Sequence, residues 1–461
     1  MSLPFVQMYV RLSDRIKDNA TLASSPSEAA HPESGKDRLI ALNPESPADS
    51  PGRAWLMPSG GTCAQKFGAP VLAVCGFSGS GKTTLLEAVI PHLIARGLAI
   101  AAIKHDSHGF AVDKEGKDSE RLFRAGATVA LRGPAEQFLR RGASSALTLE
   151  ATLADLARDH DLLLVEGHKD TPLPKLWVGN AEMSSPPEHV TDIQEILPWN
   201  SDRLTTLLKF IDKWLPKVWA SRPLSAGLLV GGKSTRMGRP KQLVSFGGIT
   251  LGEIAAHALS DGICQANANG NLCDTDSLSP NLVVLGAGPV PDSLQGLQQL
   301  PDAPELVGPI AGLLTAHRWA PRTTWILAAC DQPLLSAADI QWLIDQRRPG
   351  TWAILPRQSD DHPCPTLALY EPQALTVLER SILVHGAGSA RIAELFDHPR
   401  TRVARYFTRG LINVNTPEEL MAQEKLAEAT NQSSMWKKYR PSSCCGAQPN
   451  SELCDQAAND A

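Results

Sequence analysis

An apolar run, a glycine-rich turn and an amphipathic segment follow one another around residue 76. The turn has the spacing GxxxxGK[ST]. Glycines let several backbone N–H groups point at a phosphate, the lysine reaches the β- and γ-phosphate oxygens, and the threonine hydroxyl can bind Mg²⁺. The sequence therefore predicts a nucleoside triphosphate cradle, whose contact residues are Gly76, Gly79, Gly81, Lys82 and Thr83.

A magnesium site in such a cradle also needs a carboxylate delivered by a neighbouring strand. Glu166 closes the apolar run DLLLVEG, and Asp106 closes the run AAIKHD. We expect Glu166 to be the metal ligand, with Asp106 as the alternative. Asp118 and Ser119, in the segment GKDSERLFRAGA, lie where a nucleotide-sensing loop can run, although a helix cap explains them almost as well.

A second glycine-rich loop, in the segment LLVGGKSTRMGRPK, is not a Walker loop. Small residues around Gly231 let backbone amides approach a nucleotide, while Arg236 and Lys241 can neutralise the triphosphate whose pyrophosphate must leave. Downstream, Asp331 ends the strand candidate TWILAACD, where open α/β sheets bind their ligands. We expect Asp331 to hold Mg²⁺, which offsets the charge that accumulates during in-line attack on the α-phosphorus. Asp302, shortly before GPIAG, is a weaker candidate.

Hydrophobic periodicity indicates the elements that position these residues. VLAVCGF, TTLLEAVIPHLIARG and LAIAAIKHD alternate as strand, helix and strand, which predicts a parallel α/β sheet. TVALRG and DLLLVEG are further strands with the helix ALTLEATLADLARD between them, and the helix SDRLTTLLKFIDKWL closes the domain. SAGLLVGG opens a second α/β unit, followed by the strands LVVLG, TWILAACD, WAILPRQ and PTLALY and the final helix TPEELMAQEKLAEA.

We therefore expect two doubly wound α/β domains, an N-terminal P-loop NTPase fold and a C-terminal Rossmann-like nucleotidyltransferase fold. Polar and small residues at both ends offer too little apolar surface to offset chain entropy. The expected division is a disordered leader at 1–69, a P-loop domain at 70–216, a linker at 217–223, a nucleotidyltransferase domain at 224–428 and a disordered tail at 429–461.

Composition limits the kinds of partner. A net charge of -5 over 461 residues gives no basic field for tight non-specific binding of nucleic acid. No segment reaches the roughly 18 consecutive apolar residues of a membrane span, so we expect a cytoplasmic protein. The nine cysteines include no CxxC pair, so we expect mostly reduced thiols, with zinc binding by Cys444, Cys445 and Cys454 as a minor alternative.

The first domain resembles the molybdopterin-guanine dinucleotide biosynthesis adaptor proteins, a family of small P-loop GTP-binding proteins. The resemblance covers about residues 71–216 and is carried by GFSGSGKTTL, IKHDSHGF, KDSERLFRAGA and VEGHKDTPLPKLWV. It implies GTP binding with at most slow hydrolysis, in support of a partner that makes the guanine dinucleotide form of the molybdenum cofactor.

The second domain, about residues 224–425, resembles the molybdenum cofactor guanylyltransferases in GGKSTRMGRPK, GPIAGLL, CDQP, HPCPTLALY and NVNTPEEL. The resemblance implies that Asp331 binds both Mg²⁺ and the nucleotide, and that Asn413 and Asn415 lie toward the pterin. Turn and cap chemistry is the alternative for the two asparagines. The residues that the resemblance implies for guanine nucleotide binding are Leu229, Val230, Gly231, Lys241, Asp302 and Asp331.

The implied reaction converts GTP and Mo-molybdopterin to molybdopterin guanine dinucleotide and pyrophosphate. A phosphate monoester is already a competent nucleophile, so the reaction needs no side-chain nucleophile. RMGRPK and CDQP are also typical of molybdenum cofactor cytidylyltransferases, so CTP is the alternative to GTP. The sequence also leaves room for a sugar-phosphate nucleotidyltransferase and for a GTP-binding carrier of the cofactor. Apo-molybdoenzymes and cofactor-delivery proteins are the expected protein partners.

Overall fold

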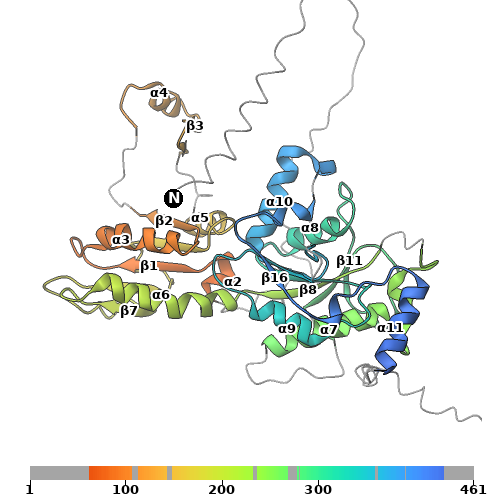
Figure 1. The fold of residues 1–461 in the computed structure, drawn as a ribbon. Helices are drawn as coiled ribbons and strands as arrows, with labels where there is room; N and C mark the ends of the chain where they lie inside the picture. The colour runs from red at the N-terminus through yellow and green to blue at the C-terminus, as the bar shows by residue number, and fades with distance from the viewer. Residues whose placement is uncertain are drawn as a thin grey trace, which may run out of the picture. The chain divides into compact units, whose positions relative to one another are not determined.

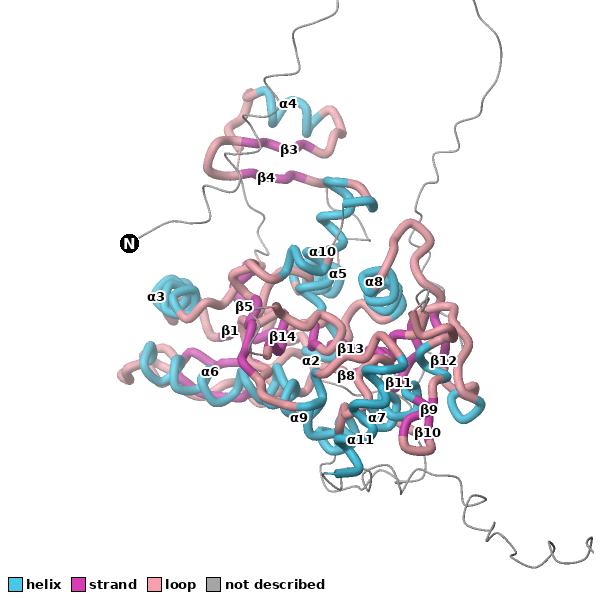
Figure 2. The backbone as a smooth tube through the Cα atoms, turned by 45° about the vertical axis from the view of Figure 1, so that its right-hand side comes forward, coloured by secondary structure: helices cyan, strands magenta, loops and turns pink. Residues whose placement is uncertain are grey.

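A computed structural model of the chain describes residues 62–105, 113–142, 148–231, 236–267, 278–279, 281–358, 362–389 and 391–429. These residues all belong to one compact unit, Pro51–Ala461. Two sheets, each with helices packed on it, make up most of the described chain (Figures 1 and 2).

The first sheet is parallel throughout, with the strand order β2-β5-β1-β6-β7. Leu72 and Val74 of its central strand pack against two helices on one face, whereas Val71 and Ala73 pack against a third helix on the other. Helices thus cover both faces, as expected of a doubly wound fold. The elements are β1 (Val71–Cys75), α3 (Lys82–Ala95), β2 (Ile100–Lys104), α5 (Leu149–Leu156), β5 (Leu162–Glu166), β6 (Lys175–Val178), β7 (Ile193–Leu197) and α6 (Arg203–Ala220).

The predicted strand TVALRG forms, but not in this sheet. It is β3 (Val129–Arg132), which pairs antiparallel with β4 (Gln137–Arg140) in a separate two-stranded sheet next to α4 (Asp118–Arg124). Only Val129 of β3 is buried, so the segment lacks the continuous burial of a parallel strand.

The second sheet is mixed, with the order β12-β11-β8-β13-β15-β14-β16, and β15 runs antiparallel to both of its neighbours. All five strands predicted for this half are present. The strands are β8 (Leu224–Leu229), β11 (Leu282–Leu285), β12 (Gln298–Leu300), β13 (Thr324–Ala329), β14 (Ala353–Arg357), β15 (Ala368–Tyr370) and β16 (Thr401–Arg405).

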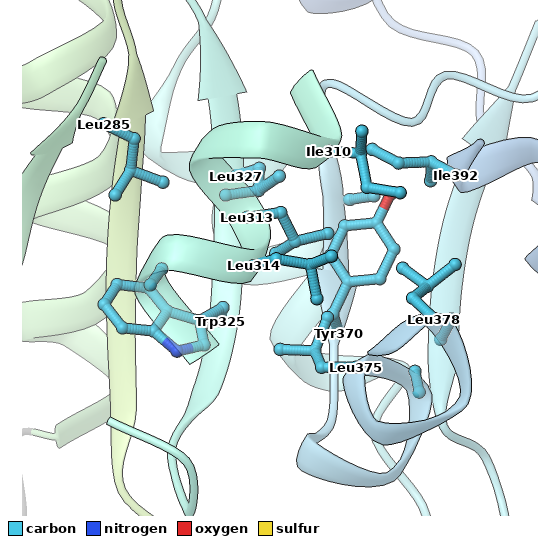
Figure 3. Close-up of a cluster of buried hydrophobic side chains, with 14 of the residues drawn as sticks. Leu285, Ile310, Leu313, Leu314, Trp325, Leu327, Tyr370, Leu375, Leu378 and Ile392 are labelled. Atoms are coloured by element: carbon cyan, nitrogen blue, oxygen red, sulfur yellow. The ribbon is translucent and has the colours of Figure 1, made fainter. Parts of the chain in front are cut away.

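Helices cover both faces of this sheet as well. One face carries α8 and α10, and Figure 3 shows Leu313 and Leu314 of α8 between Trp325 of β13 and Tyr370 of β15. The other face carries α7 and α9. The helices are α7 (Leu251–Asn267), α8 (Pro309–Trp319), α9 (Ala337–Asp345), α10 (Pro372–His385) and α11 (Pro417–Ala429). The shorter elements are η1 (Lys241–Leu243), β9 (Ser245–Phe246), β10 (Ile249–Thr250), η2 (Asp292–Leu294), η3 (Ala387–Ser389), η4 (Ile392–Leu395) and η5 (Arg409–Leu411).

The structure differs from the expected boundaries at two places. The end of the expected leader is the helix α2 (Cys63–Phe67), because Thr62 forms a capping box with Gln65 and Phe67 is buried. The expected linker at 217–223 is helical through Ala220, and Arg222 is buried. Residues 1–61 and 430–461 lie outside the described residues.

Three further observations bear on the composition. The part of the chain that the structure describes holds no helix long and apolar enough to cross a membrane. Cys63, Cys75, Cys330 and Cys364 are free thiols, as expected. Cys264 is disulfide-bonded and is the exception among the cysteines that the structure describes. The zinc ligands suggested for the tail, Cys444, Cys445 and Cys454, lie outside the described residues.

The second sheet depends on its central strand. Leu327 of β13 is fully buried, so Leu327→Ala should lower the free energy of unfolding of this half by about 2–5 kcal/mol. Leu383→Ala, on the exposed side of α10 where the residue is 77% exposed, should change it by less than about 0.5 kcal/mol. Urea unfolding followed by tryptophan fluorescence measures both, and equal losses would contradict the assignment of the core.

Candidate functional site

The first glycine-rich turn has the geometry of a phosphate cradle. It joins the end of β1 to the start of α3, and Gly76, Gly79 and Gly81 all have positive φ angles. A Cβ on Gly76 would lie 2.3 Å from the carbonyl oxygen of Val178, so no larger residue fits there. The backbone can therefore curl tightly around an anion at the N-terminus of α3.

Lys82 crosses this turn. Its Nζ donates to the carbonyl oxygens of Gly76 at 3.1 Å and Phe77 at 2.7 Å. Burial lowers the pKa of its ammonium group. The predicted phosphate-binding cation is thus held at the mouth of the loop.

The metal-binding pair predicted for the cradle comes together. The Thr83 hydroxyl donates to the Glu166 carboxylate, with oxygen distances of 2.9 and 3.0 Å. Glu166 ends β5, which lies beside β1, and Lys104 Nζ lies 3.4 Å from its Oε1. A hydroxyl and a carboxylate at this spacing suit Mg²⁺, which takes oxygen ligands.

The other candidates of this half fall elsewhere. Asp106 lies outside the described residues. Asp118 pairs with Arg121 at 3.7 Å, and the Ser119 hydroxyl donates to Asp113. Both contacts lie within 113–142, and the N-cap residue of α4 makes no side-chain capping hydrogen bond.

Sequence reasoning missed two features beside the cradle. Arg203, at the start of α6, donates to the carbonyl oxygen of Ser80 at 2.9 Å and also to that of Gly179. The rings of His105 and His168 contact each other at a tilt of 52° with their centroids 4.6 Å apart, and His168 has a left-handed φ of 57°. Burial, and then the neighbouring His105, lower the pKa of His168. The histidines were visible in IKHD and VEGHKD, whereas no local signal marks Arg203.

The second centre is a cluster of three polar side chains. Lys241 Nζ lies 3.2 Å from Asp331 Oδ2 and donates to Asn415 Oδ1 at 2.9 Å. The backbone N–H of Val414 donates to the Asp331 carbonyl at 2.8 Å, which joins the NVN loop to the end of β13. Of the two asparagines, Asn415 therefore belongs to the cluster and Asn413 is exposed.

One carboxylate oxygen of Asp331 is unpartnered. Its Oδ1 is buried and has no hydrogen-bond partner. A buried carboxylate oxygen without a donor is costly, and a cation would relieve that cost. This observation is consistent with the predicted Mg²⁺ role of Asp331.

The glycine loop leaves the sheet beside Asp331. β8 and β13 are adjacent and parallel, and Val230 and Gly231 follow the end of β8. The structure does not describe 232–235, and Arg236 is exposed on the turn that follows. A Cβ on Gly286 would lie 2.1 Å from the Val230 carbonyl oxygen, so the turn after β11 is packed directly against this loop.

Two more residues frame the loop. Asp302 follows β12, and a Cβ on Gly312 would contact its Oδ1 at 3.5 Å and Leu229 Cδ2 at 3.2 Å. Burial raises the pKa of Asp302. Gln242, which sequence reasoning missed, donates from Nε2 to the Pro289 carbonyl at 2.8 Å and so joins η1 to the turn after β11.

Neither centre is a classical metal cluster. Among the described residues, no three or more His, Cys, Asp and Glu side chains gather as they would to hold an ion. Each centre offers one carboxylate, Glu166 or Asp331, beside a glycine loop. Such a site can hold a divalent cation that phosphate oxygens also bind.

The fold and the two sites define a P-loop nucleotide-binding domain joined to a nucleotidyltransferase domain. Residues 71–199 match the family model of molybdopterin guanine dinucleotide synthesis protein B. Residues 226–400 match the MobA-like NTP transferase domain. The chain belongs to the family of molybdopterin-guanine dinucleotide biosynthesis adapter proteins through its first half and carries a MobA-like nucleotidyltransferase domain in its second.

Three relatives illustrate this combination of two domains. The molybdopterin-guanine dinucleotide biosynthesis adapter protein of Haemophilus influenzae is 37% identical over 32% of this chain and 89% of its own length. The molybdenum cofactor biosynthesis bifunctional protein of Synechocystis sp. is 28% identical over 46% of this chain and 57% of its own length. A probable molybdenum cofactor guanylyltransferase of Pelotomaculum thermopropionicum is 24% identical over 45% of this chain and 96% of its own length.

The cradle should lose its nucleotide when Lys82 is removed. We expect Lys82→Ala in the full chain to weaken GTP binding at this site by at least about tenfold, because a charge-assisted hydrogen bond to phosphate is lost. Titration with a fluorescent GTP analogue should then show one tight site fewer than the unmodified chain. Lys209→Ala, at an exposed position of α6, is the control, and an unchanged number of tight sites in Lys82→Ala would contradict the assignment.

Transfer activity should depend on Asp331. Asp331→Asn keeps the size of the side chain but removes its charge, so pyrophosphate release should fall on the order of 100-fold or more. Lys241→Ala should also lower it, and Asp302→Asn should act less strongly. Asp345→Asn, on the exposed side of α9, should have no effect. Near-normal release by Asp331→Asn at saturating Mg²⁺ would mean that another acid serves the reaction.

Proposed function

We propose that the chain is a molybdenum cofactor guanylyltransferase with a fused GTP-binding adaptor domain. It transfers GMP from GTP to Mo-molybdopterin and forms molybdopterin guanine dinucleotide and pyrophosphate. The observation that carries the proposal is the Lys241, Asp331 and Asn415 cluster, at the end of a glycine loop and with a buried Asp331 oxygen that lacks a partner. The names of the relatives support the guanine nucleotide and the cofactor as substrates.

Different residues around this centre have different roles in the proposed reaction. The glycine loop after β8 lets backbone amides approach the nucleotide, with Leu229, Val230 and Gly231 along it. Lys241 and Arg236 neutralise the triphosphate and the leaving pyrophosphate. Asp302, near Leu229, is the weaker candidate for a contact with the nucleotide. Positioning and charge neutralisation are sufficient, because the terminal phosphate of the pterin attacks the α-phosphorus without a side-chain nucleophile.

A divalent cation fits this centre. Asp331 would hold it in the transferase domain, and Thr83 with Glu166 would hold a second one in the cradle. Bound there, Mg²⁺ supplies positive charge to phosphate oxygens. Lys241 Nζ pairs with Asp331 Oδ2, which leaves the unpartnered Oδ1 for the cation.

The adaptor domain binds GTP and hydrolyses it slowly at most. Its cradle has the phosphate-binding lysine and the metal pair, but nothing in the sequence assigns a dedicated catalytic glutamine or arginine finger. We propose that this domain serves apo-molybdoenzymes and cofactor-delivery proteins that receive the product.

Base choice separates the proposal from its nearest rival. RMGRPK and CDQP are shared with cytidylyltransferases, so pyrophosphate release should be measured with Mo-molybdopterin and each NTP in turn. We expect turnover with GTP, and CTP should neither support product formation nor compete well. Turnover with CTP alone would make the chain a cytidylyltransferase, and no turnover with any NTP would make the second domain a carrier of the cofactor.

A further inference from the structure

A fully buried carboxylate lies where the strands of the first sheet begin. We call this end of a sheet, formed by the N-terminal ends of its parallel strands, the amino edge. Asp161 directly precedes β5, and its side chain has no solvent exposure. Its Oδ2 accepts the backbone N–H of Ala99 at 2.7 Å, and Ala99 directly precedes β2. Asp161 therefore marks the edge opposite to the phosphate cradle.

The remaining partners of Asp161 come from the second sheet. Trp352 Nε1 donates to Oδ1 at 2.7 Å, and Arg400 Nη1 donates to Oδ2 at 2.8 Å. Trp352 directly precedes β14, and Arg400 directly precedes β16. Because β14 and β16 are parallel, both donors lie at the amino edge of their sheet. The two sheets thus meet amino edge to amino edge.

Polar contacts surround this centre. Gln373, which is fully buried at the start of α10, donates to the carbonyl oxygens of Ala157 at 3.2 Å and His160 at 3.0 Å. Farther out are two ion pairs between exposed or half-exposed side chains, Arg380 with Asp159 at 2.7 Å and Arg158 with Glu379 at 3.3 Å. The contact thus has a fully buried, hydrogen-bonded polar centre, and a buried charge that lost its partners would be strongly destabilising.

The C-terminal end of α6 contributes to the same contact between the two sheets, which we call the joint. Glu371 directly follows β15 and is fully buried, and it accepts hydrogen bonds from four side chains of both halves. Burial opposes its ionisation, but Arg347 and Arg222 outweigh that effect and lower the pKa of Glu371. The four donors are Trp219 at 3.2 Å, Arg222 at 3.2 Å, Thr324 at 2.6 Å and Arg347 at 2.9 Å.

Both nucleotide centres lie at the other ends of these strands. β5 leads from Asp161 to Glu166, and β13 leads from Thr324, at the joint, to Asp331. At about 3.3 Å per residue these paths are about 17 Å and about 23 Å long. Since they run away from a common joint, the two path lengths together set the scale of the separation between Glu166 and Asp331, at up to about 40 Å.

We propose that the amino edges of the two sheets form a docking surface, which holds the transferase half on the P-loop half without help from the chain connection. In the docked pair the two nucleotide sites then lie back to back, facing away from each other. The occupant of the surface is the transferase half of the same chain, because Asp161 finds its charge partner Arg400 there, and Glu371 of that half pairs with Arg222, just after α6. Each site exchanges nucleotide with solvent on its own. The docking stands without the proposed function, whereas the separation of two metal–nucleotide sites rests on it.

Cleavage of the chain tests the docking. A recognition sequence for a site-specific protease is inserted between Ser221 and Arg222, directly after α6, so that α6 stays with the P-loop half whose sheet it covers. After cleavage we expect the two fragments to elute together from gel filtration at micromolar concentration as one 1:1 species. Separate elution would overturn the proposal, and so would a larger species in which two copies exchange their halves.

Two substitutions in the cleaved chain test the role of Asp161. Asp161→Asn turns one acceptor into a donor that faces Ala99 N–H and Arg400, so the fragments should dissociate at least tenfold more readily. Trp352→Phe removes one N–H from the other half and should weaken the association several-fold. This second variant keeps the test valid if the Asp161→Asn fragment misfolds. Asp155→Asn, exposed on α5, is the matched control. If both substitutions behave like this control, Asp161 does not anchor the joint.

The distance between the sites is measured in the uncleaved chain with Mn²⁺ and GTP. Pulsed electron paramagnetic resonance should give a Mn–Mn distance on the scale of the two path lengths together, at up to about 40 Å. A distance under about 15 Å would overturn the back-to-back arrangement. A chain that binds a single Mn²⁺ would contradict that arrangement together with the proposed function, whereas the cleavage result alone decides the docking.

Discussion

The direction of the parallel strands is the constraint on which the rest of this structure depends. In each sheet the strands that carry a glycine loop and a metal-binding acid run side by side and end at one edge, so loop and acid meet without any further device. β1 and β5 bring Lys82 and Thr83 to Glu166, and β8 and β13 bring the second loop to Asp331. At the opposite edges of the two sheets, the two halves of the chain meet.

Much of this arrangement could be predicted from the sequence, because it depends on local signals. GxxxxGK[ST] between an apolar run and a helix fixes a cradle, and the acids at the ends of DLLLVEG and TWILAACD follow from strand ends. The contact between Thr83 and Glu166 and that between Lys241 and Asp331 agree with those predictions. The roles of these residues in binding and transfer remain predictions.

What could not be predicted depends on contacts between distant segments. Arg203 supports the phosphate loop from a helix more than a hundred residues later, and its surroundings in the sequence carry no sign of this. Trp219 and Arg222 lie in a segment whose composition indicates a linker, yet they pair with the buried Glu371. TVALRG is a strand, as its pattern predicts, but its pairing with β4 depends on a hairpin that periodicity does not reveal.

The fate of the phosphates of GTP tests the central claim most directly. The full chain is incubated with Mo-molybdopterin and GTP labelled with ³²P at either the α or the γ position. The account predicts that the α label appears in the dinucleotide product and the γ label in pyrophosphate, in equal amounts. Release of the γ label as orthophosphate, with no α label in the product, would contradict it and would leave the chain a GTP-hydrolysing carrier.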